Sequence, residues 1–281
     1  MTSKTTRDRQ ATQTARTKRA EQASPLARHF TLGSLLRFAA PSIGMMIIIS
    51  LYTVTDGIFI GRFAGSDALA ASNIVYPVIN LVLGLAIMLA SGGSALVAKN
   101  LGEGKMAAAR RRFTLITVTA IALASALAIL AFAAGDGLLF LLGASPELLA
   151  DCRSYLYALL PFFPFAALMI LFNAFFIADG RPMQGFRVSV LAGLTNAGLD
   201  YFFLAHLGLG VFGAGLATGI ADLLSAVIGL AYFWRSSRTL RFTKPQLEWR
   251  ALGQAMYNGS SELVTQLSVG ITTFLFNILT F

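Results

Sequence analysis

Seven long apolar stretches constrain this chain more than any other feature of its sequence. They cover Phe38–Ile60, Ser72–Ala98, Phe113–Ala134, Ser154–Ala178, Arg187–Leu207, Val211–Trp234 and Asn258–Phe281. A helix needs about 20 consecutive apolar residues to cross the hydrocarbon core of a bilayer. A barrel strand would instead alternate apolar and polar residues over about ten positions. The sequence therefore predicts an all-α polytopic membrane bundle of about seven transmembrane helices.

The composition agrees with a membrane protein. Hydrophobic residues make up 56% of the 281 residues and charged residues only 12%, whereas a soluble domain carries about 25% charged residues. The single cysteine, Cys152, excludes an intrachain disulfide.

The net charge of +9 could suggest a nucleic-acid partner, but the distribution of the basic residues favours a membrane topology. With the N-terminus in the cytoplasm, 20 of the 22 Lys and Arg residues fall on the cytoplasmic side. Eight precede the first span, five lie between the second and third, two between the fourth and fifth, and five between the sixth and seventh. Only Arg62 and Arg153 fall outside. This positive-inside bias predicts a multi-pass protein of the inner (plasma) membrane that attracts anionic lipids and binds no nucleic acid.

Three motifs with catalytic or cofactor associations lack the context that they need. The sequence GLGVFG at 208–213 follows no predicted strand, so a dinucleotide fold is not expected. The sequence GEGK at 102–105 lacks the spacing of a phosphate-binding loop. His29 and His206, with one cysteine, offer no metal constellation. We expect no enzyme activity, no cofactor and no bound metal.

Several polar residues lie inside the predicted spans. An acid at a helix centre costs about 2.5–3.5 kcal/mol on insertion scales and is a functional hypothesis by default. Asn196 and Asp200 are four residues apart and share one helical face, as do Thr218 and Asp222. Neither a helix terminus nor an obvious cation lies near Asn196 and Asp200. The complete set is Asp56, Asn173, Asn196, Asp200, Thr218, Asp222 and Glu262.

Structural roles are alternatives for some of these residues. Asp56 could pair with Arg62 near the membrane interface. Asp222 could be a polar group that packs two helices, and Thr218 could donate to its own backbone. Glu262 follows NGSS and could stabilise the first turn of a helix.

Four segments carry a resemblance to a known family. They are PSIGMMIIISLYTVTDGIFIGRFAGSDALAA, SGGSALVAKNLGEGKMAAARRRF, NAFFIADGRPMQGFRVSVLAGLTNAGLDYFFL and GVFGAGLATGIAD. In this order and at this spacing they resemble the multidrug and toxin extrusion (MATE) family. The final NGSSELVTQLS resembles the bacterial branch that includes DNA-damage-inducible-type members.

The resemblance implies a domain organisation, because family members have twelve spans in two six-helix lobes. Residues 37–234 would form the six-helix N-lobe and 235–257 a cytoplasmic inter-lobe loop. Residues 258–281 would form the first helix of a truncated C-lobe. Residues 1–36 are basic and aromatic-poor, which predicts a disordered cytoplasmic tail. The chain stops inside an apolar run after an odd number of spans, so we expect a fragment that needs the missing C-lobe for transport.

The resemblance also implies roles for particular residues. Pro41 matches a first-span proline about which bending is proposed, although a proline in a first helical turn is the ordinary alternative. Asp222 belongs less clearly to the shared pattern, and its assignment rests on its spacing from Thr218. The positions expected to line an ion-coupling or substrate cavity by resemblance are Asp56, Asn196, Asp200, Thr218, Tyr155 and Asn173.

These residues predict a secondary antiporter that exports organic cations or drugs in exchange for protons. A carboxylate can hold either a proton or a cation, so the two compete, and Asp56 and Asp200 would titrate as a coupled pair. The alternatives are Na⁺ coupling, a lipid or lipid-linked precursor flippase, and a non-transporting membrane scaffold subunit. The phenylalanines around Asn173 could contact lipophilic cations, although most of them are expected to face lipid. The substrate and the oligomeric state are not encoded in these patterns.

Overall fold

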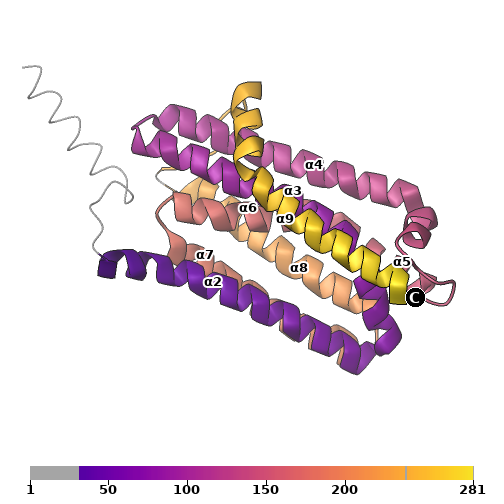
Figure 1. Cartoon of the computed structure of the whole chain (residues 1–281). Helices are drawn as coiled ribbons and strands as arrows, with labels where there is room; N and C mark the ends of the chain where they lie inside the picture. The colour runs from indigo at the N-terminus through magenta and orange to yellow at the C-terminus, as the bar shows by residue number, and fades with distance from the viewer. Residues whose placement is uncertain (1–31, 238, 281) are drawn as a thin grey trace, which may run out of the picture.

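The computed structural model describes residues 32–237 and 239–280, and these residues fold into a bundle of long helices (Figure 1). The predicted tail falls almost entirely outside the described residues. The elements are α2 (Leu32–Phe59), η2 (Ile60–Ala64), α3 (Ser66–Gly102), α4 (Met106–Leu141), α5 (Leu149–Leu159), η3 (Leu160–Phe162), α6 (Phe163–Ala178), α7 (Pro182–Asp200), η4 (Tyr201–His206), α8 (Gly210–Ala231), η5 (Tyr232–Ser236) and α9 (Trp249–Thr280).

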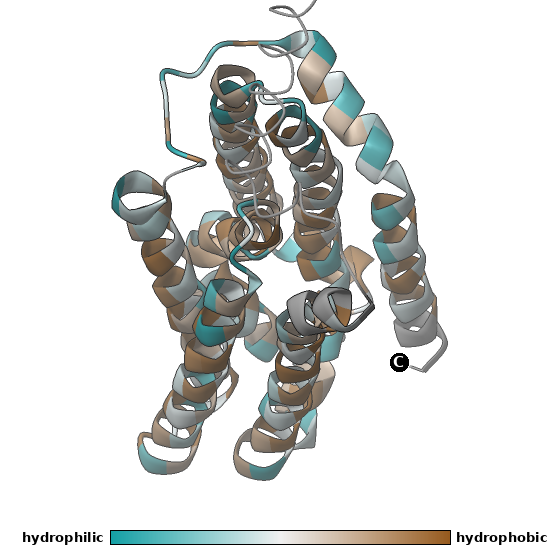
Figure 2. Cartoon of the chain, turned by 90° about the vertical axis from the view of Figure 1, so that its left-hand side faces the viewer, coloured by the Kyte–Doolittle hydropathy of each residue, from teal (hydrophilic) through white to brown (hydrophobic). Residues whose placement is uncertain are grey.

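Six segments in the described part of the chain are long and apolar enough to cross a membrane. They are Ala39–Ala64, Ser66–Gly102, Met106–Leu141, Leu149–Ala178, Pro182–His206 and Gly210–Ser236, and each contains the matching predicted span or nearly all of it. The predicted all-α membrane bundle is confirmed. Figure 2 shows the hydrophobic residues running along these helices, with hydrophilic residues concentrated near the helix ends and in the connections.

The seventh stretch is also helical, but α9 begins at Trp249 rather than at Asn258. The Asn-Gly pair at 258–259 predicted a helix start, yet the helix continues through it. A glycine inside a helix costs only about 1 kcal/mol relative to alanine, and Gly259 lies where α9 contacts the backbone of α3 at Met88. The helix α9 is not among the six candidate membrane segments found in the described residues. A seventh membrane crossing stays a prediction.

The helices extend beyond the apolar cores that predicted them. Arg110, Arg111 and Arg112 lie in the first turns of α4 rather than in a loop, and the connection from α3 is only Glu103–Lys105. A helix satisfies its own backbone hydrogen bonds in lipid and in water alike, so it does not have to end where the apolar residues end. The sequence GLGVFG does form a turn, since Gly208 and Gly210 have φ of 63° and 58°.

The helix α6 lies inside the bundle, packed against α3, α4, α7 and α8. Phe163, Phe172, Phe175 and Phe176 are therefore buried within the protein. The expectation that most of the phenylalanines around Asn173 face lipid was wrong. A helix that is apolar on all sides can be covered by protein as well as by lipid, and its sequence alone does not distinguish the two.

A buried carboxylate holds the connection between α8 and α9. Asp179 lies between α6 and α7 and is 5% exposed. Its Oδ2 accepts from the Tyr232 hydroxyl at 2.8 Å and its Oδ1 from the Ser237 hydroxyl at 3.0 Å. The backbone N–H of Leu240 donates to Oδ1 at 3.2 Å. This carboxylate thus ties the segment after η5 to the end of α6.

Candidate functional site

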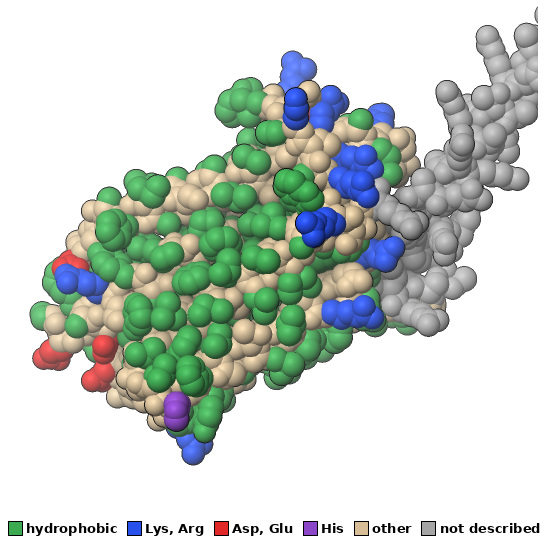
Figure 3. Space-filling view, turned by 180° about the vertical axis from the view of Figure 1, so that it is seen from behind, with side chains coloured by type: hydrophobic (Ala, Val, Ile, Leu, Met, Phe, Trp, Pro, Cys, Tyr) green, Lys and Arg blue, Asp and Glu red, His purple; other side chains and the backbone are tan. Residues whose placement is uncertain are grey.

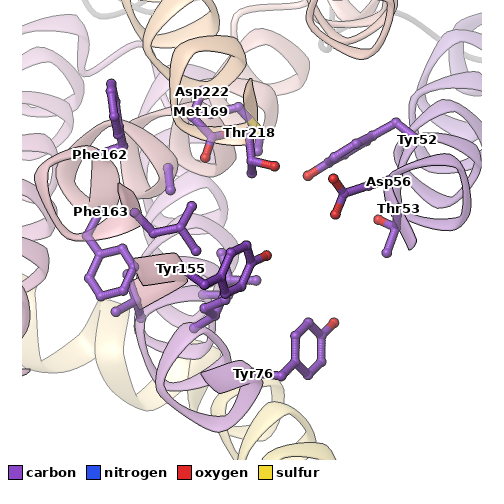
Figure 4. A pocket seen from close by; sticks show the side chains of 15 residues that line it. Tyr52, Thr53, Asp56, Tyr76, Tyr155, Phe162, Phe163, Met169, Thr218 and Asp222 are labelled. Carbon is purple, nitrogen blue, oxygen red and sulfur yellow. The ribbon is translucent and has the colours of Figure 1, made fainter. Parts of the chain in front are cut away.

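A cavity of about 120 Å³ opens between α2, α3, the α5–α6 segment and α8 (Figure 4). Its wall combines aromatic and apolar side chains with two acids. The lining residues are Tyr52, Thr53, Asp56, Tyr76, Ile79, Val82, Leu83, Tyr155, Leu159, Phe162, Phe163, Ala166, Met169, Thr218 and Asp222. Drug-sized ligands usually occupy sites of about 300–1,000 Å³, so this hollow matches part of such a ligand.

Asp56 and Asp200 meet at the edge of this cavity. Asp56 projects from α2 into the cavity, whereas Asp200, the last residue of α7, is fully buried. The two carboxyl groups are within hydrogen-bonding reach of each other. Two ionised carboxylates have only acceptors, so this bond forms only when one of them holds a proton. In the ionised state Oδ1 of Asp56 and both carboxylate oxygens of Asp200 are buried without a partner.

Asn196 and Thr218 link α7 to α8 beside these acids. The Asn196 amide donates to the Thr218 hydroxyl at 3.3 Å, while the Asn196 carbonyl oxygen is buried and unpaired. A second, smaller hollow of about 20 Å³ lies here. Its polar lining comes from Tyr52, Ser189, Asn196, Thr218, Asp222 and Ser225. Thr218 and Asp222 face both hollows, which matches their spacing of one helical turn.

Tyr155 and Asn173 are placed differently. Tyr155, on α5, is 6% exposed and lines the large cavity. Asn173, on α6, lines neither hollow, because its side chain faces α7 instead. Its carbonyl oxygen accepts from the Ser189 hydroxyl at 3.5 Å, and its amide contacts the Met169 sulfur at 3.5 Å. Asn173 thus contacts Ser189 and Met169, which line the hollows, without lining either hollow itself.

Two residues lie in the interior of helices rather than at a helix start. Pro41 is buried inside α2, which begins at Leu32, so the first-turn alternative was wrong. A proline within a helix removes one backbone hydrogen bond and favours a bend there. Glu262 is exposed in the middle of α9, so it does not stabilise a first turn. Glu262 is not among the residues that line either hollow.

Arg62 does not serve as a partner for Asp56. Its guanidinium lies over the Phe63 ring at 5.9 Å from the centroid, and no ion pair joins Arg62 to Asp56 in the described part of the chain. The structural alternative for Asp56 is therefore wrong.

The lining residues that sequence reasoning missed include four with polar, aromatic or sulfur-containing side chains. Tyr52 and Thr53 lie four and three residues before Asp56 on α2, and a search for polar residues at helical spacing from Asp56 would have found both. Tyr76 and Met169 gave no such signal. Only the packing of α2, α3 and α6 brings them to the same space.

Comparison with known proteins agrees with this fold. The sequence matches the model of the MatE family over residues 41–202, which is more than half of the chain. It is 24% identical over 253 residues to multidrug export protein MepA of Staphylococcus aureus, covering 87% of this chain and 55% of that protein. MepA of Staphylococcus saprophyticus is 21% identical over 248 residues, with 87% and 54% covered. The chain thus spans about half the length of the curated relatives that it matches.

Solved structures share the fold. A crystal structure of MATE in complex with MaD3S superposes with a TM-score of 0.79 at 24% identity, over 85% of this chain and 54% of that one. A MOP superfamily transporter from Pyrococcus furiosus superposes with a TM-score of 0.78 at 24% identity, over 85% and 53%. The branch with DNA-damage-inducible-type members is not among these matches and stays a prediction.

Proposed function

This chain belongs to the MatE family, whose members are transporters rather than enzymes, and from that premise we propose that it forms the N-lobe and seventh helix of a secondary antiporter. In this proposal the complete protein exports lipophilic organic cations or drugs across the inner membrane in exchange for protons. The matched relatives named multidrug export proteins support this substrate class.

The observation that carries the proposal is the pairing of Asp56 with Asp200. Oδ1 of Asp56 and both carboxylate oxygens of Asp200 are buried without a hydrogen-bond partner, and a proton held by one of the two acids would supply a donor to the other. Burying an unpaired charge is costly. The site is therefore suited to hold either a proton or a cationic group, and it favours occupation by one of them at all times.

Competition at this pair would couple the two movements. A proton that enters from the outer side displaces an organic cation from Asp56, and the return to the inward state carries the proton with it. Exchange of one proton for one monovalent cation moves no net charge, so a pH gradient drives it. A membrane potential adds about 2.3 kcal/mol for each 100 mV only for each proton that enters beyond the charge that leaves.

The aromatic wall suits the apolar part of such a substrate. Tyr52, Tyr76, Tyr155 and Phe162 line the cavity together with Asp56. Aromatic faces attract organic cations by about 0.5–2 kcal/mol per contact, more when water is excluded. The small volume of the hollow is consistent with a further wall from a second lobe.

Na⁺ is the second candidate for the coupling ion. The unpaired oxygens of Asp200 and Asn196 lie next to the Thr218 hydroxyl, and hard cations prefer such oxygen ligands. A flippase would use the same hollow for a lipid headgroup. A scaffold without a solute path would leave two buried acids without a purpose, so we do not favour it.

The complete protein in proteoliposomes tests the proposal. Asp200→Asn removes the charge and should abolish proton movement driven by a cationic dye, while Asp67→Asn, on the exposed first turn of α3, controls for the loss of an acid elsewhere. Unchanged exchange in Asp200→Asn would refute the antiporter. Dye movement that follows a Na⁺ gradient at constant pH would replace the proton with sodium.

A further inference from the structure

Asp222 is a second acid in the wall of the large cavity. It projects from α8, across the hollow from Asp56 on α2, and it lines both hollows. Asp200 is fully buried and lines neither hollow. The two carboxylates that a substrate in the cavity can reach are therefore Asp56 and Asp222.

Asp222 is separate from the proton-sharing pair. Asp200 lies close to Asp56 and lines neither hollow, whereas Asp222 lines both hollows from a different helix, α8. Tyr52 lies within electrostatic range of both Asp56 and Asp222 and lines both hollows. In Figure 4 its hydroxyl points into the space between the two acids.

The fold gives Asp222 no structural role that would account for its burial. It lies in the middle of α8, far from either end of that helix, and is 8% exposed. Within the described residues no ion pair and no hydrogen bond holds its carboxylate. A buried acid without a partner costs free energy, and a ligand in the cavity is what can offset that cost.

We propose that Asp222 is a second cation-binding station and that the cavity selects lipophilic cations with two positive centres, one against Asp56 and one against Asp222. This inference rests on the proposed function, because it refines the substrate class of the same cavity. A dication neutralises both reachable acids. A monocation leaves one of them to be protonated or to stay charged and hydrated.

The aromatic lining of the cavity fits this class of ligand. The Tyr52 side chain lies between the two acids in Figure 4, and Tyr76, Tyr155 and Phe162 line the same cavity, where aromatic faces attract organic cations. The Thr218 hydroxyl stands one turn from Asp222 and faces the same hollow. A planar dication with a charged group at each end would contact the two carboxylates, the aromatic side chains and the Thr218 hydroxyl.

Binding of a matched pair of dyes tests the proposal. The probes are 4′,6-diamidino-2-phenylindole, a dication, and its monoamidine analogue, a monocation of nearly the same shape. The complete protein, with its second lobe, is placed in nanodiscs of zwitterionic lipid, and the affinity of each dye is measured by fluorescence titration. The wild-type chain should bind the dication more tightly.

Asp222→Asn should reduce the ratio of dication to monocation affinity by about tenfold or more, as loss of a buried charge partner does. Asp222→Glu should restore most of the ratio, and Asp67→Asn should leave it at the wild-type value. A melting curve for each variant shows that it is folded. Asp56→Asn should weaken both dyes, because both place a charge there.

Two results would overturn the inference. If Asp222→Asn weakens both dyes by the same factor, or neither, Asp222 is not a separate station, while a loss of binding in Asp56→Asn would still support the proposed function. If the wild-type chain binds neither dye, the station and the proposed substrate class both fail.

Discussion

Asp179 and Asp200 are both buried carboxylates, but their surroundings differ. Asp179 is held by three donors, two hydroxyls and a backbone N–H. Asp200 has no donor unless Asp56 carries a proton. A satisfied carboxylate stabilises the fold, whereas an unsatisfied one is available for exchange. On this reasoning Asp179 is structural, and the unsatisfied Asp200 is the one that we propose to be functional.

Replacing Asp179 should destabilise the fold. Asp179→Ala leaves the Tyr232 hydroxyl, the Ser237 hydroxyl and the Leu240 N–H without their acceptor. Unpaired buried donors cost about 1–3 kcal/mol each, partly relieved by water, so we expect a loss of about 2–4 kcal/mol. Thermal unfolding in detergent measures it. Asp179→Asn keeps one oxygen acceptor and should lose less; equal melting temperatures for Asp179→Ala and the wild type would contradict the structural role.

The same carboxylate predicts a pH dependence. Burial raises the pKa of Asp179 above its ordinary value of 3.8, and the hydrogen bonds from Tyr232, Ser237 and Leu240 offset this only in part. A group whose pKa is raised on folding gives its largest stability at or below its unfolded pKa and loses it as the pH rises through the folded value. The melting temperature of the wild type relative to Asp179→Asn should therefore fall as the pH rises from about 4. A difference that rises with pH would contradict this sign.

Polar residues in apolar helices were predictable from the sequence, but their partners were not. The spacing of Asn196, Asp200, Thr218 and Asp222 placed each pair on one helical face, and three of the four line a hollow in the structure. The fourth, Asp200, is fully buried and lines neither hollow. Which face meets which neighbour depends on the packing of α2, α7 and α8, and residue spacing within one helix does not contain that information.

At the scale of elements, the contact between α3 and α9 brings two backbones together. A Cβ added to Gly92 on α3 would overlap the Ala255 carbonyl oxygen and the Gly259 nitrogen of α9, and one added to Gly259 would overlap the Met88 carbonyl. Glycine lets helices in membranes approach this closely, which increases van der Waals contact. This contact fixes α9 to α3. It includes Ala255, which lies in the part of α9 that precedes the predicted start at Asn258.

A methyl group at this contact should separate the two helices. In Gly92→Ala the new Cβ meets backbone atoms, which cannot move aside as a flexible side chain does. We expect a loss of about 1–3 kcal/mol from overpacking. The control is Gly253→Ala, an exposed position on α9 with no neighbouring atoms, which should stabilise the helix by up to about 1 kcal/mol. The melting temperatures of both variants in detergent measure these stability changes. A Gly92→Ala chain as stable as the wild type would disprove the close contact.

The positions of the spans were predictable because a bilayer demands long apolar helices, and Pro182–His206 contains almost all of the predicted Arg187–Leu207. The ends of the helices were not predictable from apolar residues, because polar residues continue a helix beyond the membrane into water. The position of α6 inside the bundle also escaped prediction, because its apolar sides resemble those of a lipid-facing helix.

At the scale of the whole molecule, charge divides the two ends of the bundle. In Figure 3 most Lys and Arg side chains gather at one end, beyond a hydrophobic band, while acidic residues and a histidine lie at the other end. The six membrane segments alternate in direction, so the 103–105, 179–181 and 237–248 connections share the basic end. The positive-inside rule predicts that this end faces the cytoplasm. A cavity reached from the opposite end would then take its protons from outside.

Cysteine labelling tests this orientation, and the chain is well suited to it because its single cysteine, Cys152, is fully buried. In a Cys152→Ala background, Lys105→Cys places a thiol in the α3–α4 connection and Glu147→Cys places one in the α4–α5 connection. A membrane-impermeant maleimide added to intact cells should label position 147 and reach position 105 only after the membrane is opened. The Cys152→Ala chain alone should stay unlabelled. Labelling of position 105 in intact cells would show that the topology is the reverse of the predicted one. The direction in which a proton at Asp56 could drive transport would then be reversed as well.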